Sequence, residues 1–243
     1  MKTLVLGDTH GRSLWKLITH LEQPDRVIFI GDYFDSWDLS AVEQMYNFNE
    51  IIEYKESNKT EVILLIGNHD HHYFPEVGHT GTSGYQYGAA AAISQVINDN
   101  RNHLQMAYQM DDFLFTHAGV SPVFMDNAFG QGDWDIKNVA FDLNQMFKFK
   151  PRVFDFEGME PSGDNITQTP IWIRPRSLMA ANNKHEKSLK KTYRQVVGHT
   201  EVKRIDTKGG ATGGRYYVID TLATSGEYMI INDGEISFNT WKS

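Results

Sequence analysis

The sequence predicts an α/β fold whose core is a parallel β-sheet. Three short and almost wholly apolar runs, at residues 4–6, 27–30 and 62–66, are typical of strands that are buried on both faces. Helical patterns separate these runs, and such alternation predicts right-handed crossovers between parallel strands. Each run ends at a glycine followed by aspartate or asparagine, so polar side chains should gather at the sheet edge where open α/β folds bind ligands.

Two helices are expected to connect these strands. Ser13 is placed to cap the first helix, whose apolar residues recur at helical spacing: Leu14, Leu17, Ile18 and Leu21. A longer helix should extend from about residue 38 to residue 55, with the apolar residues Val42, Met45, Tyr46, Phe48, Ile51 and Ile52.

The middle of the chain predicts a loop, a helix and a hairpin. Residues 71–88 are rich in histidine, tyrosine and glycine and lack periodicity, so we expect a loop that begins beside the site. A helix should follow at 89–98. Strands at 104–107 and 113–115 should be joined by a hairpin turn at 111–112.

The pattern is weaker beyond residue 120. Residues 135–149 have helical spacing, whereas 151–169 are polar and rich in turn formers. We expect the regions 120–170 and 71–88 to cover the site. The basic run 184–191 is interpreted as a solvated helix face.

Regular structure should return towards the C-terminus. Residues 195–197 form another apolar run that ends at Gly-His, and 216–238 predict two strands, then a turn and a third strand. The turn at 232–234 is Asn-Asp-Gly, a sequence typical of β-hairpins. We find no repeat, low-complexity segment or linker, which favours a single domain over residues 1–243.

The composition narrows the class of protein. The chain has 243 residues, is 40% hydrophobic and lacks cysteine, which excludes disulfides and cysteine-ligated zinc. No apolar stretch approaches the length of a membrane span, and a strand is predicted at the start of the chain, so we expect no signal peptide, no membrane partner and a cytoplasmic location. The net charge of −8 disfavours extended nucleic-acid binding but not a small phosphorylated substrate.

Six residues at the predicted strand ends have side chains of the kinds that bind metals: Asp8, His10, Asp32, Asn68, His117 and His199. Carboxylate, amide oxygen and imidazole suit divalent cations such as manganese, iron or zinc. Six ligands with one shared carboxylate predict a two-metal site, in which a bridging water would be largely hydroxide and could attack phosphorus in line. No serine or cysteine nucleophile is needed.

Two further residues complete the expected chemistry. His69 follows Asn68 and should face the same cavity, where an imidazolium could protonate a departing alkoxide. Asp35 follows Asp32 by one short turn and is placed to hold the other ring nitrogen of His69, which would favour the charged form.

The motifs together resemble those of a known family. In chain order they are Gly7-Asp8-Thr9-His10-Gly11, Gly31-Asp32-Tyr33-Phe34-Asp35, Gly67-Asn68-His69-Asp70, Thr116-His117-Ala118-Gly119 and Gly198-His199-Thr200. They are similar to the motifs of calcineurin-like metallophosphoesterases, above all the phosphoprotein phosphatase branch that includes the serine/threonine phosphatase of bacteriophage lambda and bacterial relatives. The resemblance implies an α/β fold with central mixed β-sheets flanked by helices, in four αββα layers.

Carried over residue by residue, the resemblance also implies roles. Asp8, His10 and Asp32 would hold the first metal, and Asp32, Asn68, His117 and His199 the second. His69 would be the general acid, with Asp35 as its orienting partner. Arg174, in the segment Trp172-Ile173-Arg174, would bind the substrate phosphate. The metals expected are two Mn²⁺ ions, with iron or zinc as alternatives, and the substrate is a phosphoprotein, a small phosphate ester or a nucleotide.

Two positions depart from the family pattern. Ser36 follows Asp35 where the eukaryotic-type branch has arginine, so one of two usual phosphate-binding arginines is missing, and Arg12 or Arg176 could replace it. Glu201 stands where many wider relatives have a second histidine, which agrees with the phosphoprotein phosphatase branch and argues against the nuclease-like branches.

Three functions stay open. They are a metal-dependent phosphomonoesterase, a pyrophosphohydrolase of dinucleoside polyphosphates or nucleotides, and a metal-bound protein without turnover, against which the pair of His69 and Asp35 argues. Asp70 is interpreted as a cap or hydrogen-bond acceptor. Three loop histidines are interpreted as solvated: His71, His72 and His79. Four loop aromatics are interpreted as packing residues: Tyr73, Phe74, Tyr85 and Tyr87.

Overall fold

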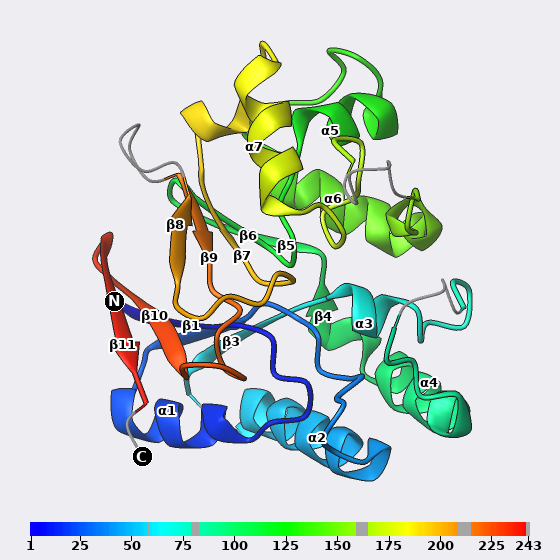
Figure 1. The fold of residues 1–243 in the computed structure, drawn as a ribbon, viewed down its shortest axis with the longest axis vertical. Coiled ribbons are helices and arrows are strands. Elements are labelled where there is room, and N and C mark those ends of the chain that lie inside the picture. The colour runs from blue at the N-terminus through cyan, green and yellow to red at the C-terminus, as the bar shows by residue number, and fades with distance from the viewer. Residues whose placement is uncertain (58, 79–82, 159–164, 209–214, 242–243) are drawn as a thin grey trace.

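The computed structural model describes residues 1–57, 59–78, 83–158, 165–208 and 215–241. Its strands form two mixed β-sheets that lie between two groups of helices (Figure 1). This arrangement confirms the α/β class with two central sheets flanked by helices. The purely parallel sheet that the apolar runs suggested is wrong in detail, because antiparallel strands complete both sheets.

The first sheet contains the three apolar runs near the N-terminus. In chain order its strands are β1 (Lys2–Leu6), β2 (Arg26–Phe29), β3 (Glu61–Leu65), β4 (Leu104–Gln105), β10 (Glu227–Asn232) and β11 (Glu235–Thr240). Their order across the sheet is β11-β10-β1-β2-β3-β4. Strands β1 to β4 are parallel, as predicted, and the C-terminal hairpin of β10 and β11 is antiparallel to β1.

The second sheet collects strands from the later part of the chain. They are β5 (Ala107–Met110), β6 (Phe113–Thr116), β7 (Arg194–Val197), β8 (Asp206–Lys208) and β9 (Tyr216–Val218), in the order β5-β6-β7-β9-β8. Met110 pairs with Phe113, so the predicted hairpin turn at 111–112 is confirmed. Strands β6, β7 and β9 are parallel, which brings their carboxyl ends together.

Alternate residues of the central strands face different layers. On one face, five residues of the first sheet lie in an apolar cluster between the sheets: Val5, Ile28, Ile30, Ile63 and Leu65. Phe115 and Val196 of the second sheet belong to the same cluster. The other face packs against helices: Leu4, Leu6, Val27, Phe29, Val62 and Leu64. Because burial of one such side chain stabilises the fold by about 1.5–3 kcal/mol, both layers hold the strand ends rigidly in place.

Helices lie on the outer side of each sheet (Figure 1). On the side of the first sheet are α1 (Leu14–Glu22), α2 (Ala41–Ser57) and α4 (Ala90–Asp99), and on the side of the second are α5 (Pro122–Phe129), α6 (Val139–Phe149) and α7 (Pro175–Lys184). The single turn α3 (Asn68–His71) follows β3 directly. Short 3₁₀ turns occupy Tyr87–Ala89, Arg101–His103, Pro151–Phe154 and Leu189–Lys191.

Two helix starts differ from prediction. Ser13 makes no side-chain capping bond to α1, because its φ of −92° and ψ of 8° are not those of the extended backbone usual at an N-cap. Helix α2 begins at Ala41 rather than near residue 38, since Ser40 and Glu43 form a capping box: the Ser40 N–H donates to Glu43 Oε2 (2.8 Å) and the Glu43 N–H to Ser40 Oγ (3.3 Å).

The strand predicted at 104–107 is two strands in different sheets. Leu104 and Gln105 belong to the first sheet and Ala107 to the second, with the buried Met106 between them. The Asn144 side chain replaces the missing ladder bonds. Its Oδ1 accepts from the N–H groups of Met106 (2.8 Å) and Ala107 (3.0 Å), and its Nδ2 donates to the Ala107 carbonyl (2.9 Å).

Some elements were not predicted, or start elsewhere than predicted. Helix α5 carries a recognisable signal, since the Phe124 N–H donates to the Ser121 hydroxyl and Pro122 occupies the first turn. Helix α6 begins at Val139 rather than residue 135. The basic run 184–191 is mostly a turn and a 3₁₀ turn, not a helix face. In the part of the chain that is described, no helix combines the length and apolarity that a membrane crossing requires.

Candidate active site

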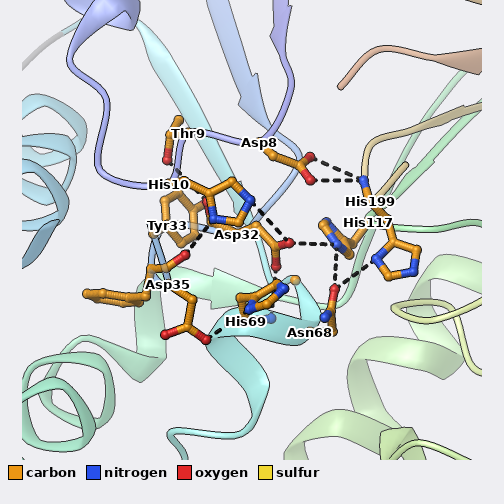
Figure 2. Close-up of polar contacts among 12 residues, drawn as sticks. Asp8, Thr9, His10, Asp32, Tyr33, Asp35, Asn68, His69, His117 and His199 are labelled. Atoms are coloured by element: carbon orange, nitrogen blue, oxygen red, sulfur yellow. Dashed lines mark hydrogen bonds and ion pairs between the residues drawn. The ribbon is translucent and has the colours of Figure 1, made fainter. Parts of the chain in front are cut away.

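Loops that follow strands of both sheets bring the six predicted metal ligands to one place (Figure 2). Asp8 and His10 follow β1, Asp32 follows β2, and Asn68 follows β3. In the second sheet, His117 follows β6 and His199 follows β7. The parallel alignment of the strands explains the convergence, because their carboxyl ends meet at one edge of the sandwich.

Glycines after the strands permit close approach of the loops. A Cβ atom on Gly67 would lie 2.0 Å from Asp32 Oδ1, and one on Gly198 would lie 2.0 Å from Asp8 Oδ1. Neither distance tolerates a side chain, so both carboxylates depend on glycine in the neighbouring loop. The Asp70 carboxylate joins the loops further. It accepts hydrogen bonds from the N–H groups of Asp32 (2.8 Å) and Gly67 (2.9 Å), which confirms its interpretation as an acceptor.

Asp32 lies at the centre of the ligand group. Its Oδ2 is 3.3 Å from His117 Nε2 and 3.9 Å from His10 Nε2. Candidate ligand atoms of Asp8, His10 and Asp32 all lie within 4.8 Å of one another. The same limit holds for Asp32, His117 and His199. The Asp32 carboxylate is therefore common to both groups, as a ligand shared by two cations would be.

Each histidine of these groups contacts a backbone carbonyl through one ring nitrogen. The pairs are His10 Nδ1 with Phe34 O (2.6 Å), His117 Nδ1 with Ile30 O (3.1 Å) and His199 Nε2 with Trp172 O (3.0 Å). Since a carbonyl only accepts, these nitrogens carry the proton. The other nitrogen of each ring then presents a lone pair to the site, which is the usual arrangement of metal-binding histidines.

Those lone pairs face oxygen acceptors. His117 Nε2 lies 3.0 Å from Asn68 Oδ1, and His199 Nδ1 lies 2.9 Å from the same oxygen. When both rings are neutral and protonated only on the carbonyl side, no hydrogen lies between these atoms, so the buried acceptors repel one another. A divalent cation among them removes that repulsion. The donor set of carboxylate, amide oxygen and neutral imidazole therefore fits divalent metals.

Burial and local charge favour the metal-binding protonation states of His10, Asp32 and His199, whereas burial and the charges of Asp220 and Asp32 raise the pKa of Asp8 well above its usual range. Burial lowers the pKa of His10 and holds the pKa of His199 well below its usual range. Burial raises the pKa of Asp32, but the imidazoles of His117 and His69 outweigh this effect, so the Asp32 pKa lies well below its usual value. Neutral imidazole and ionised carboxylate are the forms that bind cations.

The predicted pair of His69 and Asp35 is present beside this group. His69 Nδ1 lies 2.8 Å from Asp35 Oδ2, in a carboxylate that is fully buried. Burial lowers the pKa of His69, but the charge of Asp32 and the hydrogen bond with Asp35 raise it overall to about 9. The ring is therefore an imidazolium at neutral pH, and its Nε2–H is not used by Asp35.

A family profile for calcineurin-like phosphoesterases matches residues 1–222, which is most of the chain. The chain belongs to the calcineurin-like phosphoesterase family. Family membership implies hydrolysis of phosphate esters and the use of divalent metals, in agreement with the donor set above. A search among curated proteins found no match.

Solved structures share this phosphoesterase fold at low sequence identity. A cold-active protein-tyrosine phosphatase of a psychrophilic Shewanella species is 15% identical, with a TM-score of 0.61 over 99% of this chain and 80% of its own. A serine/threonine phosphatase of Saccharomyces cerevisiae, similar to human phosphatase PP5, is 14% identical, with a TM-score of 0.60 over 100% and 80%. A proposed diadenosine tetraphosphatase is 14% identical, with a TM-score of 0.50 over 100% and 95%.

Two residues interpreted above as a solvated histidine and a packing aromatic, His72 and Tyr73, contact Asp35. His72 is 1% exposed, and its Nε2 lies 2.8 Å from Asp35 Oδ2. The Tyr73 hydroxyl donates to Asp35 Oδ1 (2.5 Å) and accepts from the Gln86 N–H (2.9 Å). His71 is also buried, so the solvated interpretation of the two histidines is wrong, because the short α3 turns them inward. His79 lies outside the described residues.

A cavity of about 320 Å³ opens over the ligand group. Arg174 and Arg12 line it, whereas Arg176 does not. Arg174 Nη1 donates to the His199 carbonyl (2.8 Å), which holds the guanidinium beside the site. Ser83 lines the cavity from the segment 71–88; no described residue of 120–170 does so.

Sequence reasoning missed three other cavity residues. Asp220 and Trp37 were not considered, and Trp172 was named only as the start of the Trp-x-Arg segment. The raised pKa of Asp220, which is about 6, results first from burial and then from the charge of Asp32. The signal available for Asp220 was its place after the apolar run that forms β9, which repeats the pattern of strand followed by carboxylate seen after β1 and β2.

Proposed function

We propose that this phosphoesterase is a metal-dependent phosphomonoesterase that acts on a phosphoprotein or on small phosphate esters. One observation carries the proposal. The pair of the partly exposed His69 and the buried Asp35 lies beside Asp32, the carboxylate common to both ligand groups. A site that only bound metal would need no proton donor, whereas ester hydrolysis needs one for the leaving oxygen.

Two divalent cations are proposed as cofactors, Mn²⁺ by preference, with iron or zinc as alternatives. The first would be held by Asp8, His10 and Asp32, and the second by Asp32, Asn68, His117 and His199. When bound, such cations lower the pKa of water and neutralise phosphate charge.

His69 is proposed to move the proton in the reaction. Water adds its oxygen to phosphorus, the bond between phosphorus and the leaving oxygen breaks, and His69 Nε2 gives its proton to that oxygen. Asp35 holds the opposite nitrogen at 2.8 Å, which fixes the ring orientation and favours the charged form. His72 and Tyr73 in turn hold the Asp35 carboxylate.

Two guanidinium groups are proposed to bind the phosphate oxygens. Arg174 is placed by its bond to the His199 carbonyl, and Arg12 enters the cavity from the loop after β1. Arg12 pairs with the exposed Asp38 at 3.1 Å, a contact that a phosphate could replace. In this proposal Arg12, rather than Arg176, takes the place of the arginine that is absent at Ser36.

The test is hydrolysis of p-nitrophenyl phosphate by chelator-treated protein, before and after addition of Mn²⁺, Zn²⁺ or Fe²⁺. We expect turnover only with metal, and none with Asp32→Asn. Metal binding without turnover of any phosphate ester would contradict the proposal and favour a binding protein.

The second candidate function is hydrolysis of dinucleoside polyphosphates. The fold shared with a proposed diadenosine tetraphosphatase and the serine at position 36 favour it. Rates on a phosphopeptide and on diadenosine tetraphosphate, measured with the same metal-loaded preparation, separate the two candidates.

A further inference from the structure

Trp37 is the most exposed large hydrophobic residue among those described, with 79% of its surface in contact with solvent. It also lines the cavity that contains Asp32 and His69. Single exposed apolar residues are common on protein surfaces, but a tryptophan at the mouth of a polar site offers a large flat surface to a ligand.

The backbone that carries Trp37 is held firmly. The Ser36 hydroxyl accepts from the N–H groups of Asp38 and Leu39, both at 3.2 Å. The Ser36 N–H donates to Gln44 Oε1 (3.1 Å), and Gln86 Nε2 donates to the Ser36 carbonyl (3.2 Å). The indole is thus presented to solvent from a turn whose backbone is fixed, so a ligand that covers it need not order the chain.

Gly84 lies beside the indole. A Cβ atom on Gly84 would be in van der Waals contact with Trp37 Cζ2, at 3.7 Å, and would lie 3.3 Å from the Asp35 carbonyl oxygen. The indole therefore has the backbone of Gly84 near one edge and also borders the cavity.

Trp37 is on the side of the site where the leaving group departs. It follows Asp35, the partner of His69, by two residues. Figure 2 shows Asp35 and His69 on one side of Asp32 and His199 on the other. Arg174 lies on the His199 side, bonded to that carbonyl. A phosphate at the ligand group would direct its leaving oxygen towards His69, and hence towards Trp37.

We propose that Trp37 forms a stacking subsite for a flat aromatic ring carried on the leaving side of the substrate. The chemical class is a phosphate monoester whose leaving group carries an aromatic ring, which is either the phenol of a tyrosine phosphate or the base of a nucleotide. The assignment of the leaving side rests on the proposed function. Hydrolysis gives inorganic phosphate and the free hydroxyl compound, whose oxygen receives its proton from His69.

A binding experiment tests the subsite without turnover. Dissociation constants for phenylphosphonate and methylphosphonate, which do not hydrolyse, are measured on metal-loaded protein for Trp37→Ala, Trp37→Leu and Trp37→Phe. We expect Trp37→Ala and Trp37→Leu to weaken phenylphosphonate about tenfold, equivalent to about 1.4 kcal/mol, with little effect on methylphosphonate. Trp37→Phe should retain most of the affinity. Phe149→Ala, which removes an exposed aromatic residue at the end of α6, is the matched control and should change neither constant.

Kinetics on three substrates identify the source of the ring. The ratio of variant to wild-type kcat/KM is compared for a tyrosine-phosphate peptide, a nucleoside monophosphate and glycerol 2-phosphate. A loss confined to one aromatic substrate and seen mainly in KM supports the subsite and names its ring. Equal losses on all three substrates, or unchanged phosphonate binding, overturn it. If no ester is hydrolysed but phenylphosphonate binding still depends on Trp37, the proposed function fails and the subsite stands.

Discussion

Replacement of His69 by asparagine should slow the enzyme according to the leaving group of the substrate. An alkyl oxygen, as in phosphoserine, leaves badly as an alkoxide, whereas p-nitrophenolate leaves readily without a proton. If His69 supplies that proton, His69→Asn should reduce kcat strongly for the alkyl ester and weakly for the aryl ester. Metal content should not change, because Asn68 and not His69 is proposed as a ligand.

The structure sets the size of this effect. His69 Nδ1 is engaged with Asp35 at 2.8 Å, and in the metal-free protein the charge of Asp32 and this hydrogen bond raise the His69 pKa to about 9. A general acid that is both oriented and charged contributes about 10²–10⁴-fold. That factor corresponds to about 2.7–5.4 kcal/mol of barrier for phosphoserine. For p-nitrophenyl phosphate we expect a loss below about tenfold, since its leaving group needs little protonation.

The assay measures kcat for both esters on the wild type, His69→Asn and Asp35→Asn, with metal analysis of each preparation. Asp35→Asn should show the same trend more mildly, because it leaves the imidazole in place but misorients it and lowers its proton affinity. His20→Asn serves as the matched control, since His20 is an exposed residue of α1. It should leave both rates unchanged.

Two results would refute this reasoning. Equal losses on the two esters, with both metals retained, would mean that His69 stabilises phosphoryl charge and does not deliver a proton. Loss of a metal ion from His69→Asn would mean that the residue belongs to the ligand set.

Three further predictions follow from the site and its surroundings. Asp32→Asn should lose both metals and nearly all turnover, and chelator treatment should do the same to the wild type. Hydrolysis by protein shown to be metal-free would exclude the two-metal site. Arg174→Ala should lower kcat/KM by roughly 10²-fold, equivalent to about 2–3 kcal/mol, without a change in metal content. Arg176→Ala should leave kcat/KM unchanged. An unchanged rate for Arg174→Ala would leave Arg12 as the phosphate ligand. Burial lowers the pKa of His71 to about 4, so below about pH 6.5 the unfolded chain binds a proton that the folded chain does not. Stability should therefore fall by up to ~3 kcal/mol as the pH drops from 6.5 to 4. Denaturant titrations of chelated protein should show this slope in the wild type and a smaller one in His71→Gln; equal slopes would contradict the neutral buried state.

Much of the first sheet and the convergence of most candidate ligands could be predicted because they depend on local pattern. A continuous apolar run identifies a buried strand, and a glycine that allows close approach marks its end, as at Gly67 and Gly198. The residue after that glycine projects from the sheet edge. Asp32, Asn68 and His199 could therefore be placed together before any contact was known.

The point at which the chain passes from the first sheet to the second could not be predicted, because it is stabilised by a distant side chain. The break at Met106 is stabilised by Asn144 of α6, and no pattern within residues 104–107 indicates that bond. The contact of His72 with Asp35 is hidden for a similar reason. It depends on a single turn of helix that is too short to have a periodicity of its own.

Backbone strain at the site connects its construction to its function. Among the non-glycine residues that are described, seven have positive φ, and four of these are site residues: His10 (43°), Asp32 (54°), Asp35 (63°) and His199 (62°). Such a conformation costs about 1–3 kcal/mol at each residue, so it persists only where the surroundings impose it. At Asp32 the imposing groups are identifiable: the His10 N–H bonds to its carbonyl (2.8 Å), and Asp70 accepts from its own N–H (2.8 Å). The strand ends thus hold candidate ligand side chains in a geometry that relaxed loops would not adopt, with the ligand atoms of each group within 4.8 Å of one another.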